Sequence, residues 1–364
     1  RGWIHCLAQV IAARAPGATA GYAAVATCGR GGLPDHLRLP LLGDLVGANA
    51  GSLADQRAAL RQLLGHADPR VRAAGIAALP ALWKNGDDAD KQFATSTIVG
   101  SFASRVTMVA GTGVDAAGAL YEAIDKAKLA HAELDGAVVA RARIESDVEV
   151  GAALFELIGK RKLAAGADAC RAGLDGPPVR ARAAASCLTA LGQPPPPAAI
   201  GPAAVPPVEI EPVIGKQVRW RLATTRGEIV IRLLPSVAPW AVATVVALTR
   251  KGSYDNLELH RVVPDFVVQG GDPTQSGWGG PGFTVPSEPA TVADGAGFVV
   301  GGVGIADSGR DSGGSQWFAM HARAPHLDGR YTWIGHIESG QKSADALLIG
   351  DKVTQATVEL ADHF

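Results

Sequence analysis

The chain has 364 residues, which is too long for one ordinary hydrophobic core and long enough for two domains. Hydrophobic residues make up 47% and charged residues 19%, so the chain is expected to be globular with a sizeable core. The formal net charge of -1 argues against a general nucleic-acid or membrane-surface binder, because both rest on a positive field. No apolar run approaches the roughly 18 residues that a membrane span needs.

Residues 1–192 are rich in alanine, leucine, arginine and glycine, and their apolar positions recur at helical spacing. Leu134-Asp135-Gly136 returns about 40 residues later at positions 174–176, and each copy precedes a Val/Ala/Arg-rich helix start. Asp68-Pro69 opens another start, since proline is favoured in the first helical turn. This half resembles HEAT-type repeats, in which helical hairpins bury their apolar faces by stacking. Residues 86–113 fit the period poorly, and an irregular helical bundle is the alternative.

All four cysteines lie in this half. Cys6 and Cys28 are almost equally far from a turn expected at residues 15–18, and Cys170 and Cys187 from one at 175–178. Cysteines at equal height on antiparallel helices can face each other, so two disulfides are predicted, Cys6–Cys28 and Cys170–Cys187. The alternative is that the four cysteines are free thiols, buried like small hydrophobic side chains, as free cysteines often are. The spacing excludes a zinc motif of the C-x-x-C kind.

These two predicted disulfides favour an oxidising compartment, and a periplasmic or other extracytoplasmic location is predicted from them. The chain begins at Arg1 and not at methionine. We therefore expect that the natural start, with any signal peptide, has been removed. If the thiols are free, the alternative is a cytoplasmic protein.

A proline-rich segment separates two regions of different composition and periodicity. It contains four consecutive prolines, which favour extended polyproline II, and is expected to be a semi-rigid linker over residues 193–215. After it come short β-branched runs, VRWRLATT and GEIVIRLL, with a hairpin turn predicted at residues 225–227. The predicted organisation is therefore a helical-repeat domain at 1–192, the linker, and a β-rich domain at 216–364.

Three sequence blocks in the β-rich domain point to one family. They are LHRVVPDFVVQGGDP at 259–273, GIADSGRDSGGSQWF at 304–318 and APHLDGRYTWIGHI at 324–337. Their order and spacing resemble those of the cyclophilins, from Arg219 to Leu360. The resemblance implies an eight-stranded antiparallel β-barrel capped by two helices, expected at about 237–251 and 343–349. It implies peptidyl-prolyl cis-trans isomerase activity, so the function predicted is isomerisation of X–Pro bonds in protein clients.

The reaction needs neither covalent chemistry nor a cofactor. Rotation about an X–Pro bond is slow because amide resonance must be broken, at about 18–20 kcal/mol. A catalyst must therefore bind the twisted state better than either planar state, and a fixed cation beside the proline nitrogen helps. By match to the family motif Arg261 is that cation, with Phe266 and Gln269 completing the catalytic set. Alone, Arg261 would be an ordinary strand arginine paired with a carboxylate.

The resemblance also implies a set of substrate-binding residues. An apolar slot for proline is expected from Phe266, Val267, Phe318 and Leu327, and backbone contacts to an extended client from Ala306 and Asp307. The remaining positions that match are Gly277, Gln316, His326 and Tyr331. Asp307 stands where relatives carry asparagine, so it adds a negative charge at the rim of the groove. Trp317 is expected to face the core.

The same domain allows two other interpretations. His260, His321, His326 and His336 match no metal-ligand spacing, so no metal site is predicted. A barrel that binds proline peptides without turnover, as a chaperone or scaffold, is the alternative to an enzyme; Arg261, Phe266, Gln269 and Phe318 together favour the enzyme. The helical domain is expected to dock the isomerase on a protein partner or to position it on its clients.

Overall fold

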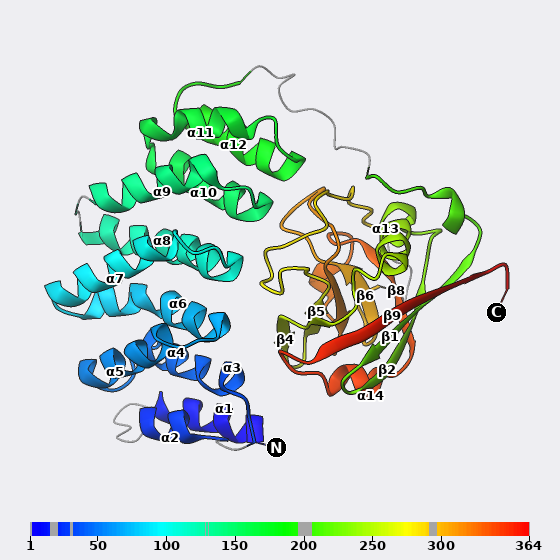
Figure 1. The fold of residues 1–364 in the computed structure, drawn as a ribbon, viewed down its shortest axis with the longest axis horizontal. Helices are drawn as coiled ribbons and strands as arrows, with labels where there is room; N and C mark the ends of the chain where they lie inside the picture. The colour runs from blue at the N-terminus through cyan, green and yellow to red at the C-terminus, as the bar shows by residue number, and fades with distance from the viewer. Residues whose placement is uncertain are drawn as a thin grey trace. The chain divides into compact units, whose positions relative to one another are not determined.

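A computed structural model describes residues 2–14, 21–29, 32–127, 129, 131–195, 206–290 and 297–363 (Figure 1). The chain divides into two compact units, residues 1–171 with 186–194, and residues 172–185 with 195–364. The domain boundaries drawn from the sequence stay a prediction. The turn expected at 15–18 and the central part of the proline-rich linker, residues 196–205, lie outside the described residues. Among the described residues no helix is long and apolar enough to cross a membrane.

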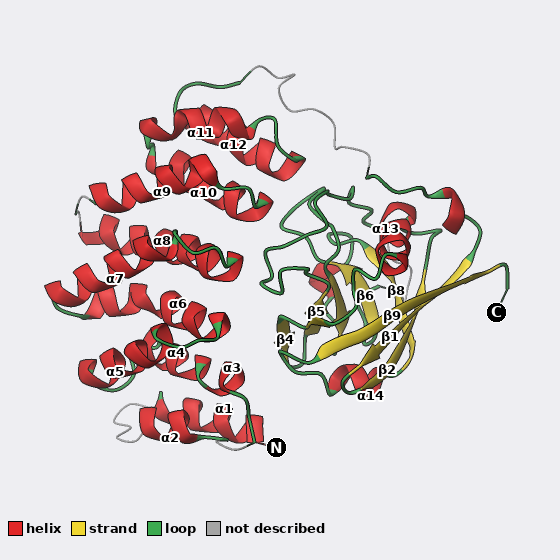
Figure 2. Ribbon diagram, viewed as in Figure 1, coloured by secondary structure: helices red, strands yellow, loops and turns green. Residues whose placement is uncertain are grey.

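The helical half consists of short to medium helices joined by brief turns (Figure 2). Its described helices are α1 (Gly2–Ala13), α2 (Tyr22–Thr27), α3 (Asp35–Arg38), α4 (Pro40–Gly47), α5 (Leu53–Leu64), α6 (Pro69–Asn85), α7 (Asp88–Ser101), α8 (Thr107–Ala127), α9 (Ala132–Ile144), α10 (Val148–Arg161), α11 (Ala167–Gly173) and α12 (Pro178–Ala190).

Helices of the first unit stack in two rows. One row is the succession α4, α6, α8 and α10, in which each helix contacts the next. The other row is formed by α5, α7 and α9, which contact α6, α8 and α10 respectively. Stacked hairpins of this kind bury an apolar face that no single hairpin could cover. The prediction of an all-α repeat-like half is confirmed, whereas assignment to the HEAT type stays a prediction.

Local sequence signals explain where these helices begin. α6 starts at Pro69, as predicted, and the Asp68 side chain accepts a hydrogen bond from the Arg70 amide at 2.8 Å. The segment 86–113, which fits the period poorly, forms an ordinary hairpin of α7 and α8, because a capping box of Asp87 and Asp90 starts α7. The two Leu-Asp-Gly copies are not equivalent: Leu134–Gly136 lies inside the first turn of α9, whereas 174–176 precedes α12.

Both cysteine pairs form disulfides in the structure. Cys6 of α1 is bonded to Cys28, which follows α2, with an S–S distance of 2.09 Å and a Cα–Cα distance of 5.6 Å. Cys170 of α11 is bonded to Cys187 of α12, with an S–S distance of 2.04 Å and a Cα–Cα distance of 6.2 Å. Each bond therefore joins neighbouring helices at one end of the helical half, in the pairing that the sequence predicts.

The second unit contains a single curled antiparallel sheet. Its strands are β1 (Gln217–Thr224), β2 (Gly227–Leu233), β3 (Leu257–Glu258), β4 (Arg261–Val263), β5 (Val267–Gly270), β6 (Gly302–Ile305), β7 (Trp317–Met320), β8 (Trp333–Ser339) and β9 (Lys352–Ala361). Their order is β3-β9-β1-β2-β8-β6-β7-β5-β4. The first and last strands of this order are separated by only two residues of chain, so the sheet must curl until its edges lie close.

This sheet confirms the predicted class and the predicted hairpin, with one difference in strand count. β1 and β2 pair directly, and their turn falls at Thr225 and Arg226. The described residues give nine strands instead of the eight expected, because Leu257 and Glu258 pair with β9 as a separate short strand. Alternate residues of β1 are buried, as a strand with one core face requires.

Two helices cover the sheet. α13 (Pro239–Arg250) contacts β9 and lies within the expected range of 237–251. α14 (Gln341–Asp345) contacts β2 but begins earlier and ends sooner than the expected 343–349. It ends early because the Leu348 amide turns away to donate to the Asp351 side chain at 2.8 Å. Trp220 fills the core between Tyr254 and Trp317, with ring centroids 5.1 and 5.5 Å apart, and Trp317 is buried as predicted.

Candidate active site

Strand register brings the polar and apolar parts of the site together. β4 pairs with β5 so that Arg261 lies opposite Gln269, and β5 pairs with β7 so that Gln269 lies opposite Phe318. Residues directly opposite in antiparallel strands place their side chains on the same face of the sheet. Val267 shares that face because it is two residues from Gln269 on the same strand. Three short strands therefore suffice to assemble the centre of the site.

A chain of hydrogen bonds runs inward from Arg261. The Arg261 guanidinium is solvent-exposed and donates from Nη1 to Gln269 Oε1 at 3.2 Å. Gln269 Nε2 donates to Gln316 Oε1 at 2.9 Å, and Gln316 Nε2 donates to the carbonyl oxygens of Gly277 and Gly279 at 3.0 and 2.8 Å. Gln316 is only 7% exposed, so its amide is fixed by the backbone. This chain holds the guanidinium in a defined place although the arginine itself reaches into water.

Aromatic and aliphatic side chains form the floor beside that guanidinium. Val267, Phe318 and Leu327 are buried in a small cluster that is separate from the main core of the sheet. Phe318 stacks on Phe298, with ring centroids 5.2 Å apart, and this fixes the Phe318 ring from behind. The Arg261 guanidinium carbon lies 5.6 Å from the Phe266 ring centroid, a cation–π distance. The site therefore places one fixed positive charge at the edge of an apolar floor.

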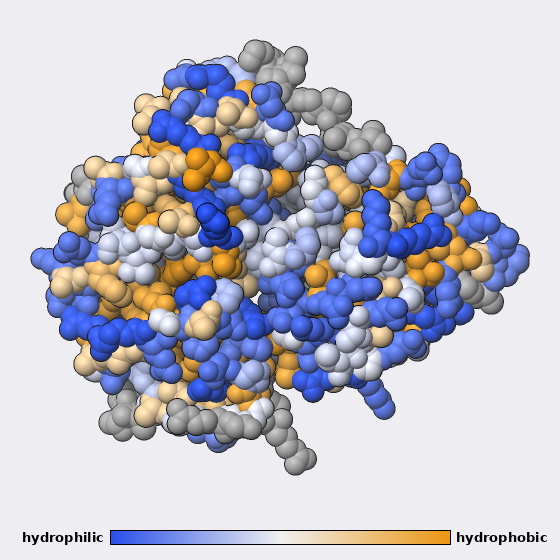
Figure 3. All heavy atoms as spheres, viewed as in Figure 1, coloured by the Kyte–Doolittle hydropathy of each residue, from blue (hydrophilic) through white to orange (hydrophobic). Residues whose placement is uncertain are grey.

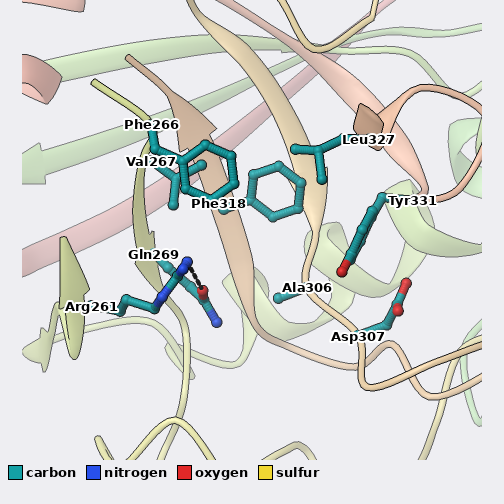
Figure 4. Close-up of a pocket in the computed structure, with 9 residues that line it drawn as sticks. All are labelled: Arg261, Phe266, Val267, Gln269, Ala306, Asp307, Phe318, Leu327 and Tyr331. Atoms are coloured by element: carbon teal, nitrogen blue, oxygen red, sulfur yellow. Dashed lines mark hydrogen bonds between the residues drawn. The ribbon is translucent and has the colours of Figure 1, made fainter. Parts of the chain in front are cut away.

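These residues enclose one pocket of about 220 Å³ (Figure 4). Its lining contains nine of the predicted site residues, namely Arg261, Phe266, Val267, Gln269, Ala306, Asp307, Phe318, Leu327 and Tyr331. The three others lie just outside the lining. Gln316 and Gly277 stand behind Gln269 in the hydrogen-bond chain, and His326 stacks on the Phe266 ring with centroids 5.9 Å apart.

The far wall of the pocket is formed where the chain leaves β6. The Ala306 amide donates to the carbonyl oxygen of Gln316 at 2.9 Å, which ties this segment to the strand that carries Phe318. Asp307 follows and is half-buried, with its Oδ1 accepting from the Gly309 amide at 3.0 Å. Burial raises the pKa of Asp307 to about 6, against the lowering effect of the Gly309 amide, and nearby Asp311 adds to the rise.

Comparisons with known proteins concern the second unit. The model of the family described as cyclophilin type peptidyl-prolyl cis-trans isomerase/CLD matches residues 219–361. Peptidyl-prolyl cis-trans isomerase B from Bacillus subtilis is 40% identical over 133 residues, which are 36% of this chain and 92% of that protein. The chain belongs to the cyclophilin-type peptidyl-prolyl cis-trans isomerases.

One further relative agrees with this assignment. A peptidyl-prolyl cis-trans isomerase from Synechococcus elongatus is 38% identical over 139 residues, 38% of this chain and 93% of that protein. A crystal structure of a Cryptosporidium parvum cyclophilin type isomerase matches at 24% identity and a TM-score of 0.36, covering 40% of this chain and 98% of that one. The sequence predictions of a cyclophilin domain and of isomerase activity are confirmed by the family match and the relatives.

Sequence reasoning missed one buried group of the cyclophilin domain, the carboxylate of Asp272. Its Oδ1 accepts from the amide and hydroxyl of Thr274 at 2.7 and 2.8 Å. Its Oδ2 accepts from the amides of Ser276, Gly277 and Gly279 at 2.8, 2.6 and 3.2 Å, and from the Ser276 hydroxyl at 3.2 Å. Asp272 thus organises the loop whose carbonyls hold Gln316. The pattern Asp-x-Thr-x-Ser, typical of side chain–backbone turns, is the signal that could have found it.

The pKa values of Asp272 and of the neighbouring His260 both depend on burial. Burial alone would raise the pKa of Asp272, but its hydrogen bonds from Thr274, Gly279 and Gly277 outweigh it and hold the pKa below the ordinary value. His260 lies half-buried beside Gly277, where an added Cβ would stand 3.3 Å from the His260 ring. Burial lowers the pKa of His260, although Asp272 opposes the shift. Of the other histidines, His321 follows β7 directly, and its Nδ1 lies 2.9 Å from Asp345 Oδ1.

Proposed function

We propose that this domain isomerises X–Pro bonds in protein clients by holding the proline ring on the apolar floor with Arg261 at its edge. In the twisted state the amide loses its resonance and the proline nitrogen gains a lone pair. A guanidinium aimed at that position stabilises the twisted state more than either planar state, which is what catalysis requires. Arginine fits this task because it stays charged and presents rigidly forked donors.

The observation that carries the proposal is the fixed guanidinium beside a proline-sized apolar floor. The Gln269–Gln316 chain restrains Arg261 before any client binds, so little reorganisation is needed at the moment of rotation. Backbone groups of Ala306 and Asp307 would pair with an extended client, and Gly277, which has no side chain, leaves room for close approach. Gln269 would hold Arg261 and, as the family resemblance implies, also contact the client backbone.

The experiment is a refolding reaction that is limited by one X–Pro isomerisation. The full chain should accelerate the slow phase of a client protein's refolding, and Arg261→Ala should remove at least about 99% of that acceleration, by analogy with deletion of one preorganised donor. The control is Arg250→Ala, an exposed arginine at the end of α13 outside the pocket. Full acceleration by a correctly folded Arg261→Ala protein would rule out the assigned role.

The helical unit would dock the isomerase on a partner or position it on clients. Stacked helical hairpins offer extended surfaces that protein partners commonly use. Apolar side chains reach the surface of this unit at several places (Figure 3), among them Phe93 at 40% and Ile144 at 76% exposure. The test compares the full chain with residues 216–364 in the refolding reaction and on a short peptide. Positioning requires that the full chain is superior on the protein and equal on the peptide; equality on both would exclude it.

The two disulfides support an extracytoplasmic location, because reducing compartments do not maintain such bonds. Non-reducing mass spectrometry with thiol titration of protein from its native host tests this. No free thiol is expected under the proposal. Four free thiols would remove its basis.

A further inference from the structure

The pocket contains one negative charge that the isomerase mechanism does not use. Arg261 and Asp307 are the two charged residues in its lining, and they lie on opposite sides of the apolar floor (Figure 4). Arg261 is engaged by Gln269, whereas among the described residues the Asp307 carboxylate accepts a hydrogen bond only from the Gly309 amide. Within the part of the chain that the structure describes, no lysine, arginine or histidine forms an ion pair with Asp307.

This carboxylate would gain from a positive charge on a bound client. It is half-buried and partly desolvated, which is why its pKa lies near 6, and it remains ionised above that pH. The nearby Asp311 adds negative potential at Asp307, and Asp311 itself has two cations close by, Arg182 and Arg310, each at 3.9 Å. A partly desolvated charge with no counter-charge on its own chain interacts more strongly with a ligand charge than a fully hydrated one does.

The reach from the floor to Asp307 fits the residues that flank the proline. Ala306 lies between the floor and Asp307 in the pocket lining (Figure 4). Consecutive Cα atoms are about 3.8 Å apart, so a residue adjacent to a proline on the floor stays beside this wall. Lysine carries its ammonium on a flexible four-carbon stem and can adapt to either direction of the chain.

We propose that Asp307 makes the isomerase selective for clients with a lysine or arginine next to the isomerised proline. This inference rests on the proposed function, because it requires the proline to occupy the apolar floor. A purely local role for Asp307, as the acceptor that shapes its turn with Gly309, predicts no charge selectivity. Asp307→Asn separates the two, since asparagine keeps the acceptor oxygen and loses the charge.

The experiment measures catalysed exchange by NMR on short peptides, which needs no coupling protease. Single lysine, alanine or glutamate residues are placed immediately before or immediately after one proline. At low salt the full-length wild-type chain should favour lysine over glutamate in kcat/KM by about tenfold at one of the two positions, since a pair of this exposure gains about threefold and its repulsive counterpart loses a similar factor. The ratio should shrink in 0.5 M salt, because screening weakens exposed pairs.

Two variants complete the experiment. Asp307→Asn should bring the lysine-to-glutamate ratio to within about twofold of one, because its charge is gone. Asp311→Asn is the matched control: it removes an acid of the same loop that does not line the pocket, at a left-handed position where asparagine is tolerated, and it should keep most of the preference. The inference is overturned if the wild-type lysine-to-glutamate ratio of kcat/KM is near one at both positions, or if this ratio is unchanged in Asp307→Asn. In either case, turnover of the alanine peptide still upholds the proposed function. No turnover of any peptide overturns both.

Discussion

Replacement of Asp272 by asparagine tests how the buried layer supports the active site. Asp272 is fully buried and accepts six hydrogen bonds from one loop. Asparagine keeps one acceptor oxygen, and in its better orientation this oxygen stays with Ser276, Gly277 and Gly279. The amide nitrogen then faces the Thr274 amide, so two donors confront each other. The change preserves volume and isolates the hydrogen-bonding role of the carboxylate.

The expected loss follows from these contacts. One buried N–H left without a partner costs about 1–3 kcal/mol, and the three backbone N–H bonds to a charged oxygen become neutral bonds, at a loss of about 1 kcal/mol each. The total is about 4–6 kcal/mol of unfolding free energy. With a denaturant slope of roughly 1–3 kcal/mol per molar urea, the midpoint of the domain should fall by about 2–3 M. The catalysed rate should also fall, by about tenfold, because the loop that fixes Gln316, and through it Arg261, is no longer held in place.

Hydrogen-exchange mass spectrometry along a urea series gives this midpoint, since it follows peptides of the cyclophilin domain separately from those of the helical unit. Asp265→Asn is the matched control, because Asp265 is exposed and has a left-handed backbone conformation that asparagine tolerates. The urea midpoint of this variant should equal that of the wild type. An Asp272→Asn protein with the wild-type midpoint would refute the assigned role of the carboxylate.

Three further predictions concern other parts of the chain. The pKa of His260 is lowered in the folded state, so the unfolded chain binds a proton first and folding stability should decline as the pH falls from about 6.5 towards that lower value. Urea midpoints measured between about pH 8 and 5 should show less of this decline in His260→Gln. Each disulfide spans about 20 residues, so loss of the Cys170–Cys187 bond in a double serine variant should lower the stability of the helical unit by about 3 kcal/mol, and an undiminished denaturation midpoint would contradict this. Residues 216–364 alone should fold and turn over a short peptide at nearly the full rate; an insoluble or inactive fragment would show that the helical unit completes the domain.

The site could be predicted from the sequence because its parts lie in short blocks with fixed spacing. Arg261 and Gln269 are eight residues apart on one hairpin, so their pairing follows from local register. Phe318 comes from a distant block and is placed only by the resemblance, which supplies the strand order. The nine lining residues were therefore available in advance, but their mutual distances were not.

What could not be predicted depends on tertiary contacts. β3 has two residues and no alternation of its own, so only its pairing with β9 reveals it. The end of α14 is decided by Asp351, whose side chain captures the Leu348 amide. Asp272 shows the same limit, because a polar residue in a glycine-rich segment is normally taken to be exposed. The Asp-x-Thr-x-Ser pattern indicates a turn that its side chain organises, but the burial of the carboxylate becomes evident only when the loop closes around it.

The central claim is that Arg261 stabilises the twisted amide more than it stabilises the bound ground state. The most direct measurement determines both quantities on one X–Pro peptide, with the dissociation constant from NMR titration and the catalysed rate from exchange spectroscopy. For Arg261→Ala the account predicts a catalysed rate lowered by at least about a hundredfold, equivalent to about 2.7–4 kcal/mol, with a dissociation constant changed by less than about fivefold. Retention of the rate, or a loss of affinity as large as the loss of rate, would contradict it.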